Sequence, residues 1–299
     1  MPNLAMTTFP PPRTAPSGWY PDPAGTGHRF FDGRTWTALR PGFIESPAHP
    51  SLPLRAAIGA LTVLIVSLIG GKALVDWLVR YDWPLISYVV ILALVGYGPS
   101  LLWGIYVRRR WGAQQFAALG WRFRWSDLGW GPVTWLAAIA VQIVLAVVVL
   151  VFRIPQSSNV DSATDLGADR AYLIATLVTA VIAAPIIEEL VFRGLVMRGL
   201  LSRTSPVVAI GLQGVLFGVA HVDPVRGAGN IGLALVLSGV GVAFGASAYL
   251  TRRLGPTVIA HAIFNGVVLA IVLSGVLDNI ETDFRSSVLT VLVDVVLRR

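Results

Sequence analysis

The sequence predicts an all-α protein, a polytopic bundle of about seven or eight transmembrane helices behind a small N-terminal β-like module. Composition is the first observation that predicts it: of the 299 residues, 55% are hydrophobic and 13% are charged, whereas an average soluble domain has about 25% charged residues. The second is the recurrence, after Leu54, of apolar runs of about 20 residues, the length that crosses a bilayer. The chain has no cysteine, which excludes disulfides and thiol chemistry.

The N-terminal region differs in composition from the rest of the chain. Residues 1–50 are rich in Pro, Gly, Thr and Trp and hold no apolar run long enough to span, so we divide the chain into a soluble module with its linker (1–50) and a transmembrane domain (51–299). The stretch "GWYPDPAGTGHRFFDGRTWT" contains "PDPAGTG", which predicts a turn, and "FFDGRTW", which predicts a hairpin around Asp32-Gly33. Interleaved aromatic residues predict a miniature β module with an aromatic core, and a ligand-binding aromatic surface is the alternative.

The apolar runs after this module predict the spans in order. A further run, 287–297, is too short to cross unaided and is expected to lie as a peripheral helix. The loop 108–131 combines arginines with tryptophans, which is typical of a segment at the level of the lipid headgroups. The seven expected spans are 56–78, 84–107, 132–152, 171–192, 206–222, 230–250 and 256–276.

Arginines predict how the chain is oriented. They follow the second, fourth and sixth spans, which places these ends on the cytoplasmic side and the N-terminus with them. We therefore expect a multi-pass protein of the plasma membrane with the lipid bilayer as its partner. The net charge of +7 belongs to these loops and predicts no nucleic-acid partner. The arginines are Arg108 to Arg110, Arg198 with Arg203, and Arg252 with Arg253.

The fourth span contains two of the four glutamates of the chain, in "PIIEELVFRGLV". Glu189 and Arg193 are four residues apart and share a helix face, so they are expected to form an ion pair that offsets the cost of burying both. Glu188 points about 100° away from Glu189 and has no local partner. An unpaired acid in a span is a candidate for proton chemistry. Pro185 lies three residues before Glu188 and is expected to kink the helix.

Histidines and an amide occupy two later spans. His261 and Asn265 are four residues apart on one helix face, and Phe217 and His221 repeat that spacing. Three helices can thus gather a carboxylate, two imidazoles and an amide around one cavity. A lone histidine in a span is more often a hydrogen-bonded packing residue, but the joint pattern favours function.

Three ordered motifs, "EELVFR", "FGVAH" and "HAIFN", resemble those of the CPBP family, also called the Abi family, of CAAX-protease-type intramembrane endopeptidases. The resemblance covers about residues 130–275, which it marks as a protease core. The N-terminal stretch resembles a small domain of unknown function found in actinobacterial membrane proteins, with Phe31 where Trp is usual.

The resemblance implies hydrolysis of a peptide bond in a membrane-associated protein or peptide, including a prenylated C-terminus. It assigns Glu188 and His221 to the activation of water and His261 and Asn265 to the stabilisation of the oxyanion. A glutamate in a dry cavity can act as a general base near neutral pH. Glu188, His221 and His261 also form a His₂Glu set that suits zinc with an open water position, and a metal-free glutamate mechanism needs the same residues. Both remain open.

Two other functions remain as alternatives: a proton- or ion-coupled transporter, and a non-catalytic scaffold or immunity protein. Spans one to three hold no counterpart of the later polar residues, which disfavours the internal repeat of a transporter. Lys72 and Asp76 are instead expected to form an i,i+4 pair in the first span. Counting about 1.5 Å per residue from the expected cytoplasmic ends, His261 lies roughly 8 Å deep and His221 roughly 22 Å, a mismatch for a shared cavity.

Overall fold

A computed structural model describes residues 18–22, 28–31, 35–36, 52–112, 115–157 and 170–274. The chain divides into two compact units, Met1–His49 and Pro50–Arg299. The described part is mostly helical, as the sequence predicts.

The first unit contains a two-stranded antiparallel sheet. Strand β1 (Gly18–Pro21) pairs with β2 (His28–Phe31), and residues 23–27 of the expected "PDPAGTG" turn between them lie outside the described residues. An isolated antiparallel bridge joins Phe31 to Trp36, and the rings of Tyr20, Phe31 and Trp36 meet edge to face. Residues 32–34, at the expected Asp32-Gly33 turn, lie outside the described residues.

The second unit is a bundle of helices. One long helical segment, Arg170–Leu200, carries both glutamates and contains two π-helical stretches between its α-helical parts. It consists of α4 (Arg170–Val178), a π-helical turn η4 (Thr179–Ala183), α5 (Ala184–Glu189), a second π-helical stretch η5 (Leu190–Val196) and α6 (Met197–Leu200). The other helices are α1 (Leu54–Leu78), η1 (Val79–Tyr81), α2 (Leu85–Trp111), η2 (Phe116–Leu119), α3 (Asp127–Val151), α7 (Pro206–Val219), η6 (Pro224–Gly229), α8 (Asn230–Thr251) and α9 (Gly255–Leu273).

Among the described residues, five helices are long and apolar enough to cross a membrane. The expected fifth and seventh spans, 206–222 and 256–276, are shorter in the structure, where the apolar helices cover Pro206–Val219 and Gly255–Ile271. The third span begins earlier than expected, at Asp127, whose buried carboxylate accepts from the backbone N–H of Arg124 and pairs with Arg253. The expected peripheral helix 287–297 lies outside the described residues.

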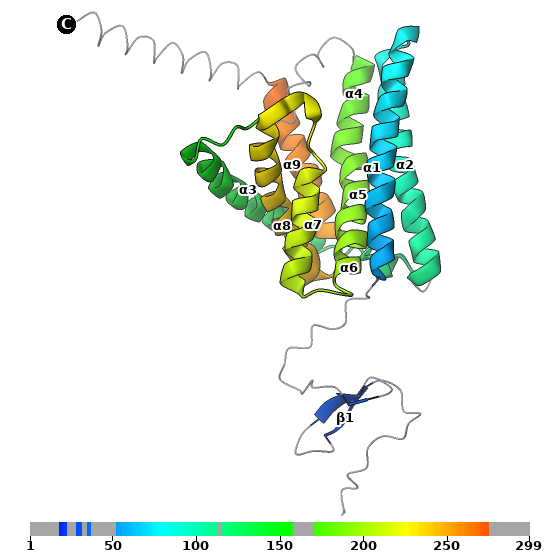
Figure 1. Ribbon diagram of the computed structural model, residues 1–299, viewed down its shortest axis with the longest axis vertical. Coiled ribbons are helices and arrows are strands. Elements are labelled where there is room, and N and C mark those ends of the chain that lie inside the picture. The colour runs from blue at the N-terminus through cyan, green and yellow to red at the C-terminus, as the bar shows by residue number, and fades with distance from the viewer. Residues whose placement is uncertain are drawn as a thin grey trace, which may run out of the picture. The chain divides into compact units, whose positions relative to one another are not determined.

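The segment Arg170–Leu200 lies between the α1–α2 pair and the group formed by α3, α7, α8 and α9 (Figure 1). Its η5 part is buried throughout, since all seven residues from Leu190 to Val196 are buried. The glutamates therefore lie where the two halves of the bundle meet.

Close helix packing places α7 against α8. A Cβ on Gly218 would clash with the carbonyl oxygen of Ala234, and one on Gly241 would come within 2.9 Å of the Cα of Gly214. Small residues of this kind let helix backbones approach in a membrane. The approach brings the α8 backbone close to the polar residues of α7.

The arginine-rich ends share one end of the bundle, as the alternation of charges predicts. Arg198 donates to the carbonyl of Arg252 (3.3 Å), and Arg253 binds the buried Asp127 through Nε (2.9 Å). Arg55, at the start of α1, stacks on the ring of Trp111 at the end of α2. These contacts involve the ends of five helices, α1, α2, α3, α6 and α8.

Candidate active site

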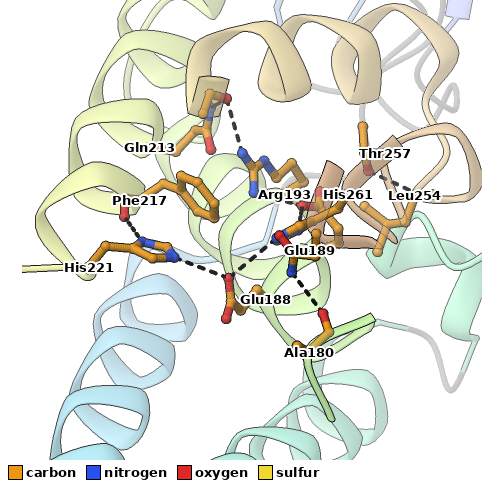
Figure 2. Close-up of polar contacts among 12 residues, drawn as sticks. Ala180, Glu188, Glu189, Arg193, Gln213, Phe217, His221, Leu254, Thr257 and His261 are labelled. Carbon is orange, nitrogen blue, oxygen red and sulfur yellow. Dashed lines mark hydrogen bonds and ion pairs between the residues drawn. The ribbon is translucent and has the colours of Figure 1, made fainter. Parts of the chain in front are cut away.

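The fold brings the polar residues of the late helices together around one carboxylate (Figure 2). The two glutamates end α5, and the arginine follows one turn later in η5. The first histidine lies in the turn just beyond α7, and the second lies on α9 with the asparagine one turn further along. These residues are Glu188, Glu189, Arg193, His221, His261 and Asn265.

Glu188 has two carboxylate oxygens in different environments. Oε1 accepts a hydrogen bond from the hydroxyl of Tyr97 (3.2 Å). Oε2 is buried and has no hydrogen-bond partner among the described residues. It lies 3.9 Å from Nε2 of His221 and 3.9 Å from Nε2 of His261. These gaps exceed a direct hydrogen bond but suit a water molecule bound off the line between the atoms.

Both imidazoles are oriented through Nδ1. His221 Nδ1 lies 2.8 Å from the carbonyl oxygen of Phe217, and His261 Nδ1 lies 3.0 Å from Oε1 of Glu189. Each of these acceptors requires Nδ1 to carry a proton. In the neutral ring, Nε2 is then the basic nitrogen, and both Nε2 atoms face Glu188.

The sequence predicts the pair of Glu189 with Arg193, and the structure contains it. Arg193 Nη1 donates to Oε1 of Glu189 (2.9 Å), and both side chains are fully buried. The same carboxylate oxygen faces His261, which the sequence does not predict. Glu189 therefore links the ion pair to the imidazole beside Glu188, so its role extends beyond offsetting the charge of Arg193.

Arg193 is held by aromatic rings and by the backbone of α8. Its guanidinium lies 4.5 Å from the ring centroid of Phe217 and 5.3 Å from that of Phe244. Nη2 donates to the carbonyl of Gly241 (3.2 Å), which also accepts from Gln213 Nε2 (2.8 Å). The close packing of α7 and α8 supplies this carbonyl, which no pattern in the sequence indicates.

Asn265 is anchored by a carbonyl that a proline leaves free. In η4 the N–H of Ala184 bonds to the carbonyl of Thr179, five residues back. The next bond of that register would run from residue 185 to Ala180, but Pro185 has no N–H. Asn265 Nδ2 fills the vacancy by donating to the carbonyl of Ala180 (2.7 Å). Pro185 thus acts on the site through this carbonyl.

A cavity of about 420 Å³ opens beside Glu188. Its wall includes Glu188, His221 and Asn265, together with Tyr97 from α2 and Tyr172 from α4. His261 is not part of this wall and is only 4% exposed, so it lies behind Glu188 instead of facing the cavity.

The expected depth mismatch between the histidines does not keep them apart. The ring of Phe217 lies 4.7 Å from that of His221 and 5.8 Å from that of His261, centroid to centroid. Because α7 does begin at Pro206, α7 and α9 either start at different levels or are inclined to each other.

The donor set has the right chemistry for zinc, but its spacing is wide. Ligand atoms at about 2.0–2.1 Å from a tetrahedral zinc lie about 3.3 Å from each other, whereas Glu188 Oε2 is 3.9 Å from each Nε2. No group of three His, Cys, Asp or Glu side chains in the described ranges is placed to hold a metal ion. As placed, the residues fit a water molecule better than a metal.

Sequence reasoning missed two contributors to this site. Tyr97 lies in the second helix, where a tyrosine carries no signal because interfacial and packing tyrosines are common in spans. The carbonyl of Gly241 has no side chain to mark it. Both become visible only through the contacts between helices.

Comparison with protein families gives two matches. Residues 170–267 match the family described as type II CAAX prenyl endopeptidase Rce1-like, and residues 17–42 match a protein family of unknown function, DUF2510. No curated protein and no solved structure matches the chain. The first matched segment holds all six polar residues of the site. The described residues also contain five helices long and apolar enough to cross a membrane, which indicates an integral membrane protein.

Proposed function

We propose, on the premise that residues 170–267 form a domain of the CAAX protease family, that this chain hydrolyses a peptide bond of a membrane-associated protein or peptide by means of a water molecule held at Glu188. One observation carries the proposal. Glu188 presents an unpartnered oxygen to two oriented imidazoles beside a cavity large enough for a peptide segment. Buried polar atoms are usually hydrogen-bonded, so an unpaired carboxylate oxygen that faces two imidazoles supports a bound water there.

In the proposed reaction the water lies between Glu188 Oε2 and Nε2 of His221. Glu188 takes a proton from the water, and the water oxygen attacks the carbonyl carbon of the scissile bond. The tetrahedral intermediate then collapses, the C–N bond breaks, and the amine leaves with the proton held by Glu188. His221 supports this step because its bond to Phe217 directs Nε2 toward the water.

The oxyanion role is proposed for Asn265 at the cavity wall, and for His261 if its ring turns from its place behind Glu188 toward the cavity. Asn265 uses one amide hydrogen on Ala180 and keeps a second for the oxyanion, at the cavity wall. His261 can donate through Nε2 only as an imidazolium, because Nδ1–H is engaged by Glu189. The carboxylates of Glu188 and Glu189 flank this ring and complement its positive charge.

Zinc remains the alternative to the metal-free reaction. Glu188, His221 and His261 would be its ligands, and the metal would supply a polarised water. The bonds from each Nδ1 to an acceptor resemble the contacts that orient metal-binding histidines. The two imidazoles would have to move toward Glu188 by a few tenths of an ångström for this.

The test is cleavage of a quenched-fluorescent peptide library, including prenylated peptides, by the full chain reconstituted in liposomes. Glu188→Gln should abolish cleavage and leave thermal stability unchanged, because the amide keeps the acceptor for Tyr97 but cannot take a proton. Asp76→Asn removes a carboxylate on α1 that is 61% exposed and paired with Lys72, and serves as the matched control. Metal content per chain and sensitivity to a chelator separate the two reactions.

An active Glu188→Gln variant would contradict the role of Glu188. Proton- or ion-coupled flux in the same liposomes without cleavage of any peptide would favour the transporter. Absence of both activities, with the protein folded, would favour the scaffold.

A further inference from the structure

A residue outside the matched family segment holds the reactive carboxylate. Tyr97 lies on α2, 91 residues before Glu188, and its hydroxyl donates to Glu188 Oε1 over 3.2 Å. The side chain is half-buried and lies on the wall of the cavity. Among the described residues, this is the only hydrogen bond that the Glu188 carboxylate accepts.

The bond selects which oxygen faces the imidazoles. The terminal torsion of a glutamate is broad and nearly two-fold, so the side chain alone does not fix its carboxylate plane. With Oε1 held by Tyr97, Oε2 points to the side where both Nε2 atoms lie. Without that donor the carboxylate plane is free to rotate, and the proposed water loses its fixed acceptor.

The backbone around Tyr97 is itself secured to α1 and to the glutamate helix. Ser67 Oγ donates to the carbonyl of Gly96, the residue before Tyr97, over 2.7 Å. Further along α2, Gly104 packs against the side chain of Leu190, two residues after Glu188. These contacts hold α2 before and after Tyr97, and so fix the position of the tyrosine hydroxyl relative to Glu188.

We propose that Tyr97 is a positioning residue of the hydrolytic site, which orients the Glu188 carboxylate toward the water held between Glu188 and His221. The proposal rests on the proposed function. It also means that the helices before residue 170 complete the site, although the family match begins there.

The test compares two tyrosine-to-phenylalanine variants of the full chain in liposomes, with the most rapidly cleaved peptide of the library as substrate. Tyr97→Phe removes one hydroxyl and keeps the ring. Tyr106→Phe removes the same group from the same helix, about 13 Å further along, where the side chain is 48% exposed. We expect Tyr97→Phe to lower kcat about tenfold, the worth of one hydrogen bond to a charged group, with KM and Tm unchanged. Tyr106→Phe should match the parent chain.

Each other outcome overturns the proposal. An unchanged kcat in Tyr97→Phe would show that Glu188 needs no external donor. A raised KM with the parent kcat would assign the hydroxyl to substrate binding, and a lowered Tm would assign it to stability. If the parent chain cleaves nothing, the premise fails with it, whereas a cleaving parent with an unaffected variant refutes Tyr97 alone.

Discussion

Replacing Glu189 by glutamine tests the two contacts that this side chain makes. Glu189 is fully buried, and one of its oxygens lies 2.9 Å from Arg193 Nη1 and 3.0 Å from His261 Nδ1. The Glu189→Gln variant keeps the volume but removes the charge. Arg193 would then remain buried with the carbonyl of Gly241 as an acceptor, and His261 would face a neutral amide.

The stability loss can be worked from the burial. Removing one partner of a buried ion pair costs about 3–5 kcal/mol, mostly because the other charge stays uncompensated. With roughly 2–4 °C per kcal/mol for a chain of this size, the Tm of Glu189→Gln should fall by about 10 °C. Arg193→Met should cost about as much, since it strands Glu189 in the same way.

The two variants differ in what they do to His261. Arg193→Met leaves the carboxylate that orients the imidazole, whereas Glu189→Gln removes it. Near a temperature where both are folded, kcat should therefore fall by about ten- to a hundredfold in Glu189→Gln and much less in Arg193→Met. The assays are thermal unfolding in detergent and peptide cleavage in liposomes.

The double variant Glu189→Gln/Arg193→Met supplies the control, because it buries no charge. Its loss of stability should be smaller than the sum of the two single losses by a coupling energy of about 2–3 kcal/mol, and its Tm should be correspondingly higher. Additive losses of stability would refute the buried ion pair as the reason for the first result. Equal kinetic losses in the two single variants would refute the orienting role of Glu189.

Two further predictions concern other parts of the bundle. Pro185→Ala restores a backbone N–H that competes with Asn265 for the free carbonyl, so kcat should fall several-fold, while Tm stays level or rises because proline is unfavourable inside a helix; an unchanged kcat would separate Pro185 from the site. Asp127→Asn should lower stability by about 3 kcal/mol, because it strands Arg253 beside a buried amide, whereas Asp76→Asn, at an exposed pair, should cost less than about 1 kcal/mol. Chemical unfolding of both variants checks this difference, and equal losses would contradict the role of burial.

Much of the fold is local information and was therefore predictable. The helical class and the long apolar segments follow from composition and run length, since a bilayer demands helices of a set length. The pair of Glu189 with Arg193 also follows, because four residues of one helix fix the distance between two side chains. Helix ends were less predictable, as the early start at Asp127 shows, because contacts with distant segments, such as the pair of Asp127 with Arg253, contribute to them.

In the candidate site, the residues were predictable from the sequence, whereas most of their contacts were not. The motifs marked Glu188, His221, His261 and Asn265, because charged and polar groups inside apolar runs are costly and stand out. The sequence alone left Glu188 without a partner, placed both histidines at the cavity and put them at unequal depths. The structure gives Glu188 a donor on α2, moves His261 behind the carboxylate and closes the gap in depth.

By itself, then, the sequence determined which segments are apolar enough to form long helices, and it singled out the polar side chains within them. The tertiary structure decided the partners: Tyr97 for Glu188, His261 for Glu189, and the carbonyls of Gly241 and Ala180 for Arg193 and Asn265. The physical reason is that helix periodicity fixes contacts within a helix, whereas contacts between helices depend on tilt, level and close approach, which only the packed bundle sets.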